Sequence, residues 1–186
     1  MKLSKIITLG LSVGAILLFS GCASKATMEN MVYKSAVHQQ YSPALKESIE
    51  IEKISGGHIT VPVYISEIGD DEFKDAVKNS LIAEKLYSDN GRYKLIIEIN
   101  DMDHPMFGLD LKVTLDINYR LIDSKTNKEV LNKKLVSSYT ATFSDSAIAI
   151  KRLRLANEGS GRESIKALLQ ELSKLQIDPN EVSVIK

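Results

Sequence analysis

The sequence predicts an α+β domain of two layers, a mostly antiparallel sheet with two helices packed on one face. Three observations support this class. Long segments alternate apolar with polar residues, as half-buried strands do, and two other segments have apolar residues at helical spacing. These segments follow one another in the order strands, helix, strands, helix.

The 24 basic and 24 acidic residues balance, so the charge gives no reason to expect binding to nucleic acid.

The single folded domain is predicted to span residues 47–178. Before it, residues 22–46 are polar and show no sustained period, which indicates a flexible tether. The first strand begins near Ile49, where isoleucines alternate with glutamates. A glycine pair then leads into a second strand-like piece, residues 58–65, whose proline suits an edge or an irregular strand.

The first helix is predicted to start at Asp70 and Asp71, because acidic residues cap helices and complement the positive end of the helix dipole. A turn at residues 89–91 follows it. Residues three and four positions apart are predicted to form its buried stripe: Phe73, Ala76, Val77, Ser80 and Leu81.

Three strands are predicted between the two helices. The first covers residues 93–102, and the second, residues 112–121, alternates apolar and polar side chains without a fault. That alternation predicts one buried and one solvated face. A polar turn at residues 123–128 leads to the hairpin partner, residues 129–142.

The last helix is predicted to begin at a cap formed by Ser144 or Asp145 and to end near Leu175, with a clean apolar face in its second half. The Gly-Ser-Gly sequence at residues 159–161 is expected to kink or break this helix. Residues 179–186 open with a proline and are expected to form a C-terminal tail.

Residues 1–21 have the three-part layout of a secretory signal. Two lysines form a basic patch, residues 6–19 form an uncharged apolar run, and small residues precede Cys22. The run is too short to cross a bilayer comfortably, since a spanning helix needs roughly 20 apolar residues. Cys22 is the only cysteine, so the chain holds no internal disulfide.

The sequence Leu-Phe-Ser-Gly-Cys at residues 18–22 resembles the lipobox of bacterial lipoproteins, although that family prefers leucine where Phe19 stands. The resemblance implies cleavage between Gly21 and Cys22, a diacylglycerol on the thiol and an acyl chain on the new amino terminus. It also implies an outer-membrane location facing the periplasm, because Ala23 and Ser24 follow the cysteine and no aspartate stands at the second position of the mature chain. The alternative is an ordinary secretory signal that ends near a buried free cysteine.

The sequence offers few groups for catalysis or metal binding. No two of its three histidines, at positions 38, 58 and 104, have metal-ligand spacing. Aspartates 101, 103 and 110 flank His104, which would suit a divalent ion or acid-base chemistry. The same residues are typical of a polar loop between strands. We therefore expect no metal, no cofactor and no catalysis.

Two further clusters are candidate contact sites. Met106, Phe107 and Leu109 form an apolar connection between strands, which either tucks under a helix, as we expect, or presents a knob to a partner. Arg152 and Arg154 could contact an anion such as a phosphate. We favour a solvated helix face in which Arg154 pairs with Glu158 at four-residue spacing.

Three stretches together resemble a family of small, uncharacterised proteobacterial lipoproteins: residues 105–110, 139–145 and 152–159. The similarity runs from about Ile49 to Leu175. Some members carry the name UDP-N-acetylglucosamine acyltransferase, but acyltransferases of the β-helix class need hexapeptide repeats, and the sequence shows none. The order of elements is also similar to that of envelope lipoproteins of the YajG and LptE kind.

The predicted function is therefore that of a membrane-anchored periplasmic lipoprotein. It would bind or scaffold another envelope component, a protein or a glycolipid, through the Phe107 connection or a sheet edge. The alternative is an enzyme or ligand-binding protein of envelope glycolipid metabolism, using Arg152, Arg154 and Glu158 with the Asp103-His104 loop. A third possibility is a lipid carrier, which would require an apolar cleft between sheet and helices.

Overall fold

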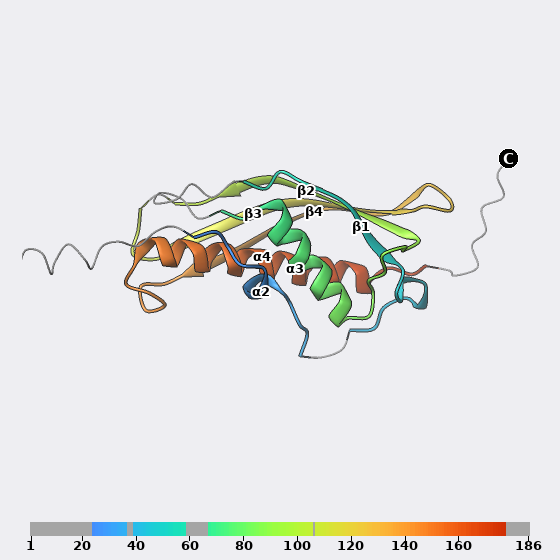
Figure 1. Ribbon diagram of the computed structural model, residues 1–186, viewed down its shortest axis with the longest axis horizontal. Coiled ribbons are helices and arrows are strands. Elements are labelled where there is room, and N and C mark those ends of the chain that lie inside the picture. The colour runs from blue at the N-terminus through green and yellow to red at the C-terminus, as the bar shows by residue number, and fades with distance from the viewer. Residues whose placement is uncertain (1–23, 37–38, 59–66, 106, 178–186) are drawn as a thin grey trace, which may run out of the picture.

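The computed structural model describes residues 24–36, 39–58, 67–105 and 107–177. A four-stranded sheet in the order β1-β2-β3-β4 forms one layer, and the helices cover one of its faces (Figure 1). The strands are β1 (Ile49–Ser55), β2 (Tyr93–Asp103), β3 (Leu111–Asp123) and β4 (Lys128–Ala141). Two of the three pairings are antiparallel, and the predicted α+β class is confirmed.

The pairing of β1 with β2 is parallel. It is parallel because helix α3 (Asp70–Ala83) lies between these strands in the chain and carries it back across the sheet. Helix α4 (Ala149–Ser173) packs along β3 and β4. A short helix, α2 (Met28–Met31), packs against both α3 and α4. One 3-10 turn, η1 (Pro43–Leu45), precedes β1.

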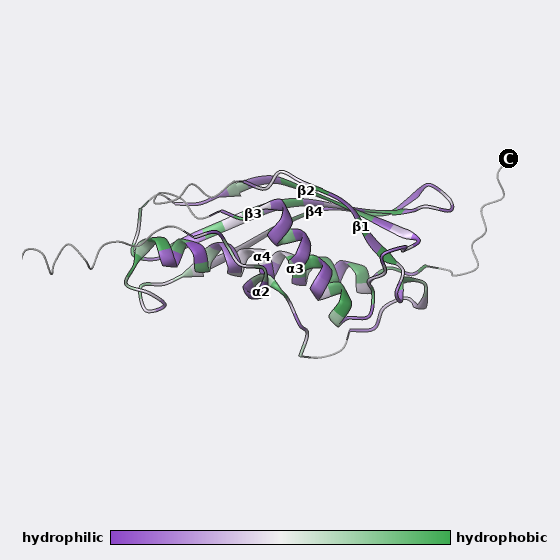
Figure 2. Cartoon of the chain, in the orientation of Figure 1, coloured by the Kyte–Doolittle hydropathy of each residue, from purple (hydrophilic) through white to green (hydrophobic). Residues whose placement is uncertain are grey.

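The core lies between the sheet and the helices. Along β3, buried residues alternate with less buried ones over the whole strand, as the sequence predicted. Figure 2 shows hydrophilic and hydrophobic residues interspersed along the strands. Tyr119 of β3 is fully buried, and its hydroxyl lies 2.8 Å from the Ser164 hydroxyl of α4. This bond satisfies two polar groups that would be costly to bury alone. Burial raises the pKa of Tyr119, so the phenol stays protonated.

The predicted stripe of α3 is confirmed, because Phe73, Ala76, Val77, Ser80 and Leu81 are its buried residues. Its start differs from the prediction. Gly69 occupies the N-cap position without a side-chain cap. The Asp70 carboxylate instead accepts a hydrogen bond of 2.7 Å from the backbone N–H of Gly57, and so fixes the turn after β1.

Helix α4 begins later than predicted and does not break. The predicted cap Asp145 accepts hydrogen bonds from the backbone N–H (2.7 Å) and hydroxyl (2.9 Å) of Thr142, closing a turn before the helix. The glycines at 159 and 161 lie within continuous helix. They serve close packing, since a Cβ at Gly159 would overlap the Tyr139 ring of β4, and one at Gly161 would lie 2.9 Å from the Met31 sulfur.

The tether predicted for residues 22–46 is wrong for the part of it that the structure describes. Ala26, Met31 and Leu45 are fully buried and belong to the hydrophobic core. Their spacing has no period because the segment is mostly irregular, so each side chain reaches the core separately. Of the other predictions, most of the strand over 58–65, the leader and the C-terminal tail lie outside the described residues. Among the described residues, no helix has the length and apolar character to span a membrane.

The ion pair between Arg92 and Asp123 yields a pH-dependent prediction. The Arg92 guanidinium donates to both carboxylate oxygens, at 2.8 and 2.6 Å, and lowers the pKa of Asp123 from 3.8 to about 2. A lowered folded-state pKa contributes stability above pH 3.8 that is lost as the pH falls through about 2. We expect Asp123→Asn to lower the free energy of unfolding by about 2 kcal/mol at pH 7 and to remove this pH dependence, measured by urea denaturation. Equal losses at pH 7 and pH 2 would contradict it.

The two helical glycines yield a matched pair of variants. Alanine normally stabilises a helix relative to glycine by about 1 kcal/mol. In Gly159→Ala the new methyl group would force the Tyr139 ring aside, so we expect a loss of about 1–3 kcal/mol. Gly161→Ala meets the flexible end of Met31 and should lose less. Thermal unfolding of both variants tests this, and equal stability would show that the ring does not pack on α4.

Candidate functional site

The first described segment, residues 24–36, is held against the helices, and we call it the N-terminal arm. The backbone N–H of Ala26 donates to the carbonyl of Glu67 at 3.1 Å. The backbone N–H of Tyr33 donates to the Ser80 hydroxyl of α3 at 2.9 Å. These two hydrogen bonds hold the arm against the domain near both of its ends.

The strongest hold on the arm comes from Glu158 of α4, which is only 2% exposed. One of its carboxylate oxygens accepts from the backbone N–H (3.0 Å) and the hydroxyl (3.1 Å) of Thr27. The other accepts from the Asn30 side-chain amide at 2.9 Å. A buried carboxylate is costly unless it is hydrogen-bonded and paired, and the arm supplies these donors.

Arginines of α4 complete the attachment. Arg154 lies 3.7 Å from the Glu158 carboxylate, so the predicted ion pair is confirmed. Arg154 also donates to the Ser24 hydroxyl at 2.6 Å, and Arg162 donates to the Asn30 carbonyl at 3.0 Å. The predicted solvated face is wrong where the arm covers α4, because Glu158 and its neighbours are enclosed.

Arg152 is the second buried charge of α4, at 4% exposure. Its guanidinium donates to the carbonyls of Ser146 (2.7 Å) and Gly108 (3.3 Å) and lies 5.4 Å from the Phe143 ring centroid. It therefore joins the β2–β3 connection to the β4–α4 connection. The expected alternatives, a solvated cation and an anion contact, both assumed an accessible side chain, and Arg152 is enclosed by these partners.

The two connections that Arg152 joins expose an apolar surface. Phe107 is 88% exposed, and three other side chains on the same two connections are also exposed: Leu109 at 72%, Phe143 at 53% and Ile148 at 51%. We call these four side chains the apolar tip. The expectation that the connection tucks under a helix is wrong for Phe107 and Leu109, and Met106 lies outside the described residues.

The reason is that the space beneath the tip is occupied. Leu111 at the start of β3 and Leu153 near the start of α4 are buried, and the Arg152 guanidinium lies between the two connections. The Asp110 carboxylate accepts from the backbone N–H of Phe143 at 3.0 Å, which adds a second link. Both connections, the start of α4 and the first described residues lie toward one end of the molecule (Figure 1).

The polar loop around His104 forms no metal centre in the described part of the chain. Within those residues there is no group of three histidine, cysteine, aspartate or glutamate side chains that could hold an ion. The His104 imidazole instead lies 3.2 Å from the Glu67 carboxylate. His58 donates its backbone N–H to the Ile68 carbonyl, and His38 lies outside the described residues.

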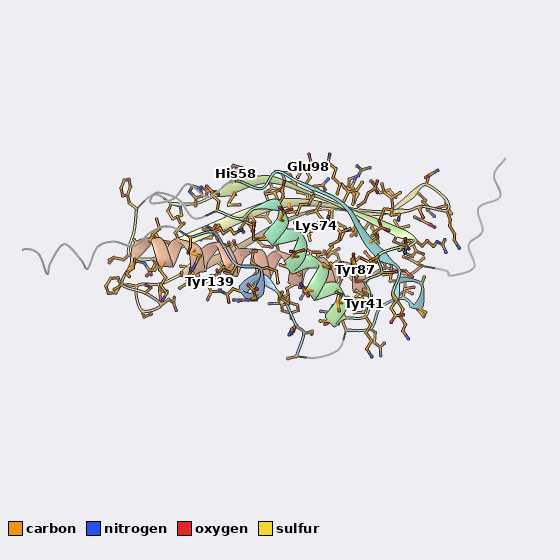
Figure 3. All side chains as sticks on the ribbon, viewed as in Figure 1. Tyr41, His58, Lys74, Tyr87, Glu98 and Tyr139 are labelled. Atoms are coloured by element: carbon orange, nitrogen blue, oxygen red, sulfur yellow. The ribbon has the colours of Figure 1, made fainter. Side chains whose placement is uncertain are left out.

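A pocket lies beside the C-terminal end of α3. Tyr41 and Tyr87 lie near the C-terminal end of α3, along the molecule from Tyr139 (Figure 3). There a shallow pocket is lined by Tyr41, Pro43 and Leu86, and the Tyr41 hydroxyl donates to Glu84 at 3.3 Å. The interface between sheet and helices, where a lipid carrier would need a cleft, is filled by fully buried side chains such as Tyr119, Leu115 and Leu168.

The free edge of β4 is the other contact surface that the sequence suggested. Strand β4 ends the sheet in the observed strand order. Lys133 pairs in register with Tyr119, whose side chain points into the core, yet Lys133 is exposed. A charge at an inward position of an edge strand discourages the addition of another strand. The apolar tip is therefore the better candidate site.

The sequence matches no protein-family model and no curated protein. Solved structures share its fold. One is a Caulobacter crescentus protein provisionally classed as a lipoprotein, with 18% identity over 70% of this chain and 90% of that one, at a TM-score of 0.50. Another is a Xanthomonas campestris protein of the DUF330 family, with 17% identity over 76% and 94% and a TM-score of 0.51. At such low identity the likeness establishes the fold alone.

The sequence did not indicate that Thr27 and Asn30 fix the arm, or that the Glu158 carboxylate they contact is buried. The four-residue spacing of Arg154 and Glu158 was the one available signal, and it indicated a pair without indicating burial. The described part of the structure brings Phe107 and Leu109 together with Arg152. Gly21 and Cys22 lie outside it.

Removing the Glu158 carboxylate should release the arm. In Glu158→Ala the donors of Thr27 and Asn30 lose their acceptor, so we expect faster amide hydrogen exchange in residues 24–34 and a loss of about 1–3 kcal/mol in the free energy of unfolding. Exchange mass spectrometry resolves this segment from the rest of the chain.

The matched control is Glu163→Ala on the same helix. Glu163 pairs with Lys166 at 3.0 Å, and both side chains are 37% exposed. Exposed pairs contribute about 0–1 kcal/mol, so this variant should keep the exchange pattern of the parent protein. If both variants left the arm equally protected, Glu158 would not be what holds it.

Proposed function

We propose that the protein is a lipid-anchored lipoprotein of the bacterial envelope that acts without catalysis and contacts another envelope component through its apolar tip. One observation carries the proposal. The arm that leads to Cys22 is fixed on α4 by Glu158 and Arg154, beside the connections that present Phe107 and Leu109. The fixed start of the arm and the apolar tip thus lie at one end of the domain, which supports a lipid anchor and a contact surface on that side.

The lipid anchor is supported by the sequence around Cys22. A basic patch, a short apolar run and a Ser-Gly pair precede the only cysteine of the chain. A similar fold in a protein provisionally classed as a lipoprotein is consistent with this assignment. We place the anchor in the outer membrane, facing the periplasm, because Ala23 and Ser24 follow the cysteine and no aspartate stands there.

The absence of catalysis is supported by what the strongest chemical candidates do. Arg152 donates to two backbone carbonyls, and Glu158 accepts from Thr27 and Asn30. Both groups are nine-tenths buried or more, so their polar atoms serve the fold. A glycolipid enzyme would need them free to meet a substrate, so the enzyme alternative gains no support from these contacts.

Lipid attachment can be tested at its single predicted site. In a bacterial host supplied with labelled palmitate, we expect the parent chain to take up label and to fractionate with membranes. Cys22→Ser should lose the label and leave the membrane fraction, because two or more acyl chains are what give stable anchoring. Mass spectrometry of the parent protein should show an acylated Cys22 as the first residue.

A second variant controls for the thiol itself. Ser124 is exposed in the turn between β3 and β4, so Cys22→Ser combined with Ser124→Cys keeps one thiol at a different position. It should remain unlabelled. A parent protein whose Cys22 thiol is unmodified, or whose residues 1–21 are still attached, would refute the proposed anchor.

A further inference from the structure

We infer that the envelope component met by the apolar tip is the lipid bilayer itself, in which the acyl chains of Cys22 are embedded. This inference rests on the proposed function, since it takes the anchor as given. It adds a second attachment: the lipid holds the arm, and Phe107 with the other three side chains of the apolar tip enters the surface of the same bilayer.

Only a short stretch of chain separates the fixed arm from the lipid. Ser24 accepts a hydrogen bond from Arg154 at the start of α4. Cys22 is two residues away, and an extended chain spans at most about 3.6 Å per residue, so the anchor lies within about 7 Å of Ser24. The domain therefore cannot stand off from the membrane on a long linker.

The short connection also determines which end of the domain lies at the membrane. Arg154, which holds Ser24, and Arg152, which holds the Gly108 carbonyl, both lie near the start of α4 and project from different sides of the helix, so the arm and the tip lie at the same end of its axis. The same short stretch of helix thus holds both the anchored arm and the apolar tip. A protein partner at the tip would have to fit between the domain and the bilayer, and the short connection leaves little room for one.

The chemistry of the tip suits a lipid surface. Two phenylalanines, a leucine and an isoleucine, all more than half exposed, would leave water on entering the acyl-chain boundary. Exposed charges of both signs surround them, with Lys112 and Lys151 among the cations and Asp110 and Asp145 among the anions. Insertion should therefore depend on apolar burial, and neutral lipid should suffice.

The tip is also held rigidly enough to act as a unit. Arg152 joins the two connections through the Ser146 and Gly108 carbonyls, and Asp110 joins them again through the Phe143 N–H. Little conformational freedom is then left to lose when the tip enters the bilayer, which favours binding.

The chain contains no tryptophan, so a single substitution makes the tip its own reporter. The full chain carrying Phe107→Trp is purified in its lipidated form and reconstituted into phosphatidylcholine vesicles with brominated acyl chains. We expect a blue-shifted emission and strong quenching by the bromines. Val136→Trp, on the outer face of β4 and 64% exposed in the parent, is the matched control and should show neither effect.

Two further measurements sharpen the result. Adding Leu109→Asp and Phe143→Asp to the Phe107→Trp chain should reduce the quenching, while the lipid keeps the protein on the vesicles. Raising the salt concentration should leave the quenching of Phe107→Trp unchanged, because apolar burial drives the insertion.

The outcomes separate this inference from the proposed function. An acylated protein that sediments with vesicles but shows equal quenching at positions 107 and 136 would overturn bilayer contact and leave the tip for a protein partner. An unmodified Cys22 in mass spectrometry would overturn the anchor, and bilayer contact with it. Quenching at 107 alone establishes the contact.

Discussion

The buried carboxylate of Glu158 is the constraint that organises the functional end of this protein. A carboxylate enclosed at 2% exposure must find donors, and α4 alone provides only the Arg154 guanidinium at 3.7 Å. The N–H and hydroxyl of Thr27 and the amide of Asn30 provide the rest. The arm is therefore part of the fold, and Glu158 together with Arg154 fixes the point from which the chain leaves toward Cys22.

A second buried charge shapes the same end in the opposite sense. The Arg152 guanidinium needs acceptors, and it takes carbonyl oxygens from the two connections that flank it. By holding the backbones of these connections inward, it leaves their apolar side chains pointing out. Glu158 thus holds the arm against the helix, whereas Arg152 holds the backbone of the two connections so that their apolar side chains remain exposed. Both effects follow from the cost of an unpaired buried charge, and both arise in the first three turns of α4.

Sequence periodicity predicted the elements whose burial is local. Strand β3 was expected over 112–121 and covers Leu111–Asp123, and the five predicted stripe residues of α3 are all buried. The features that periodicity missed depend on contacts far apart in the chain. Thr27 and Glu158 are 131 residues apart, so nothing near either residue signals their bond. Gly159 was interpreted as a kink because the sequence does not show that a Tyr139 ring occupies the space of its missing side chain.

The position of the tip also bears on which surfaces remain for other partners. The strands run along the length of the molecule, with the tip at one end (Figure 1). If that end rests on the membrane, the solvated face of the sheet stands away from the bilayer, and the edge of β4 runs outward beside it. Lys133 disfavours the addition of a strand at that edge, because the added strand would have to pack beside the exposed Lys133 ammonium group. The sheet face, which carries exposed side chains such as Val136, then remains open to a protein partner, and its alternating polar residues favour a transient contact over a permanent one.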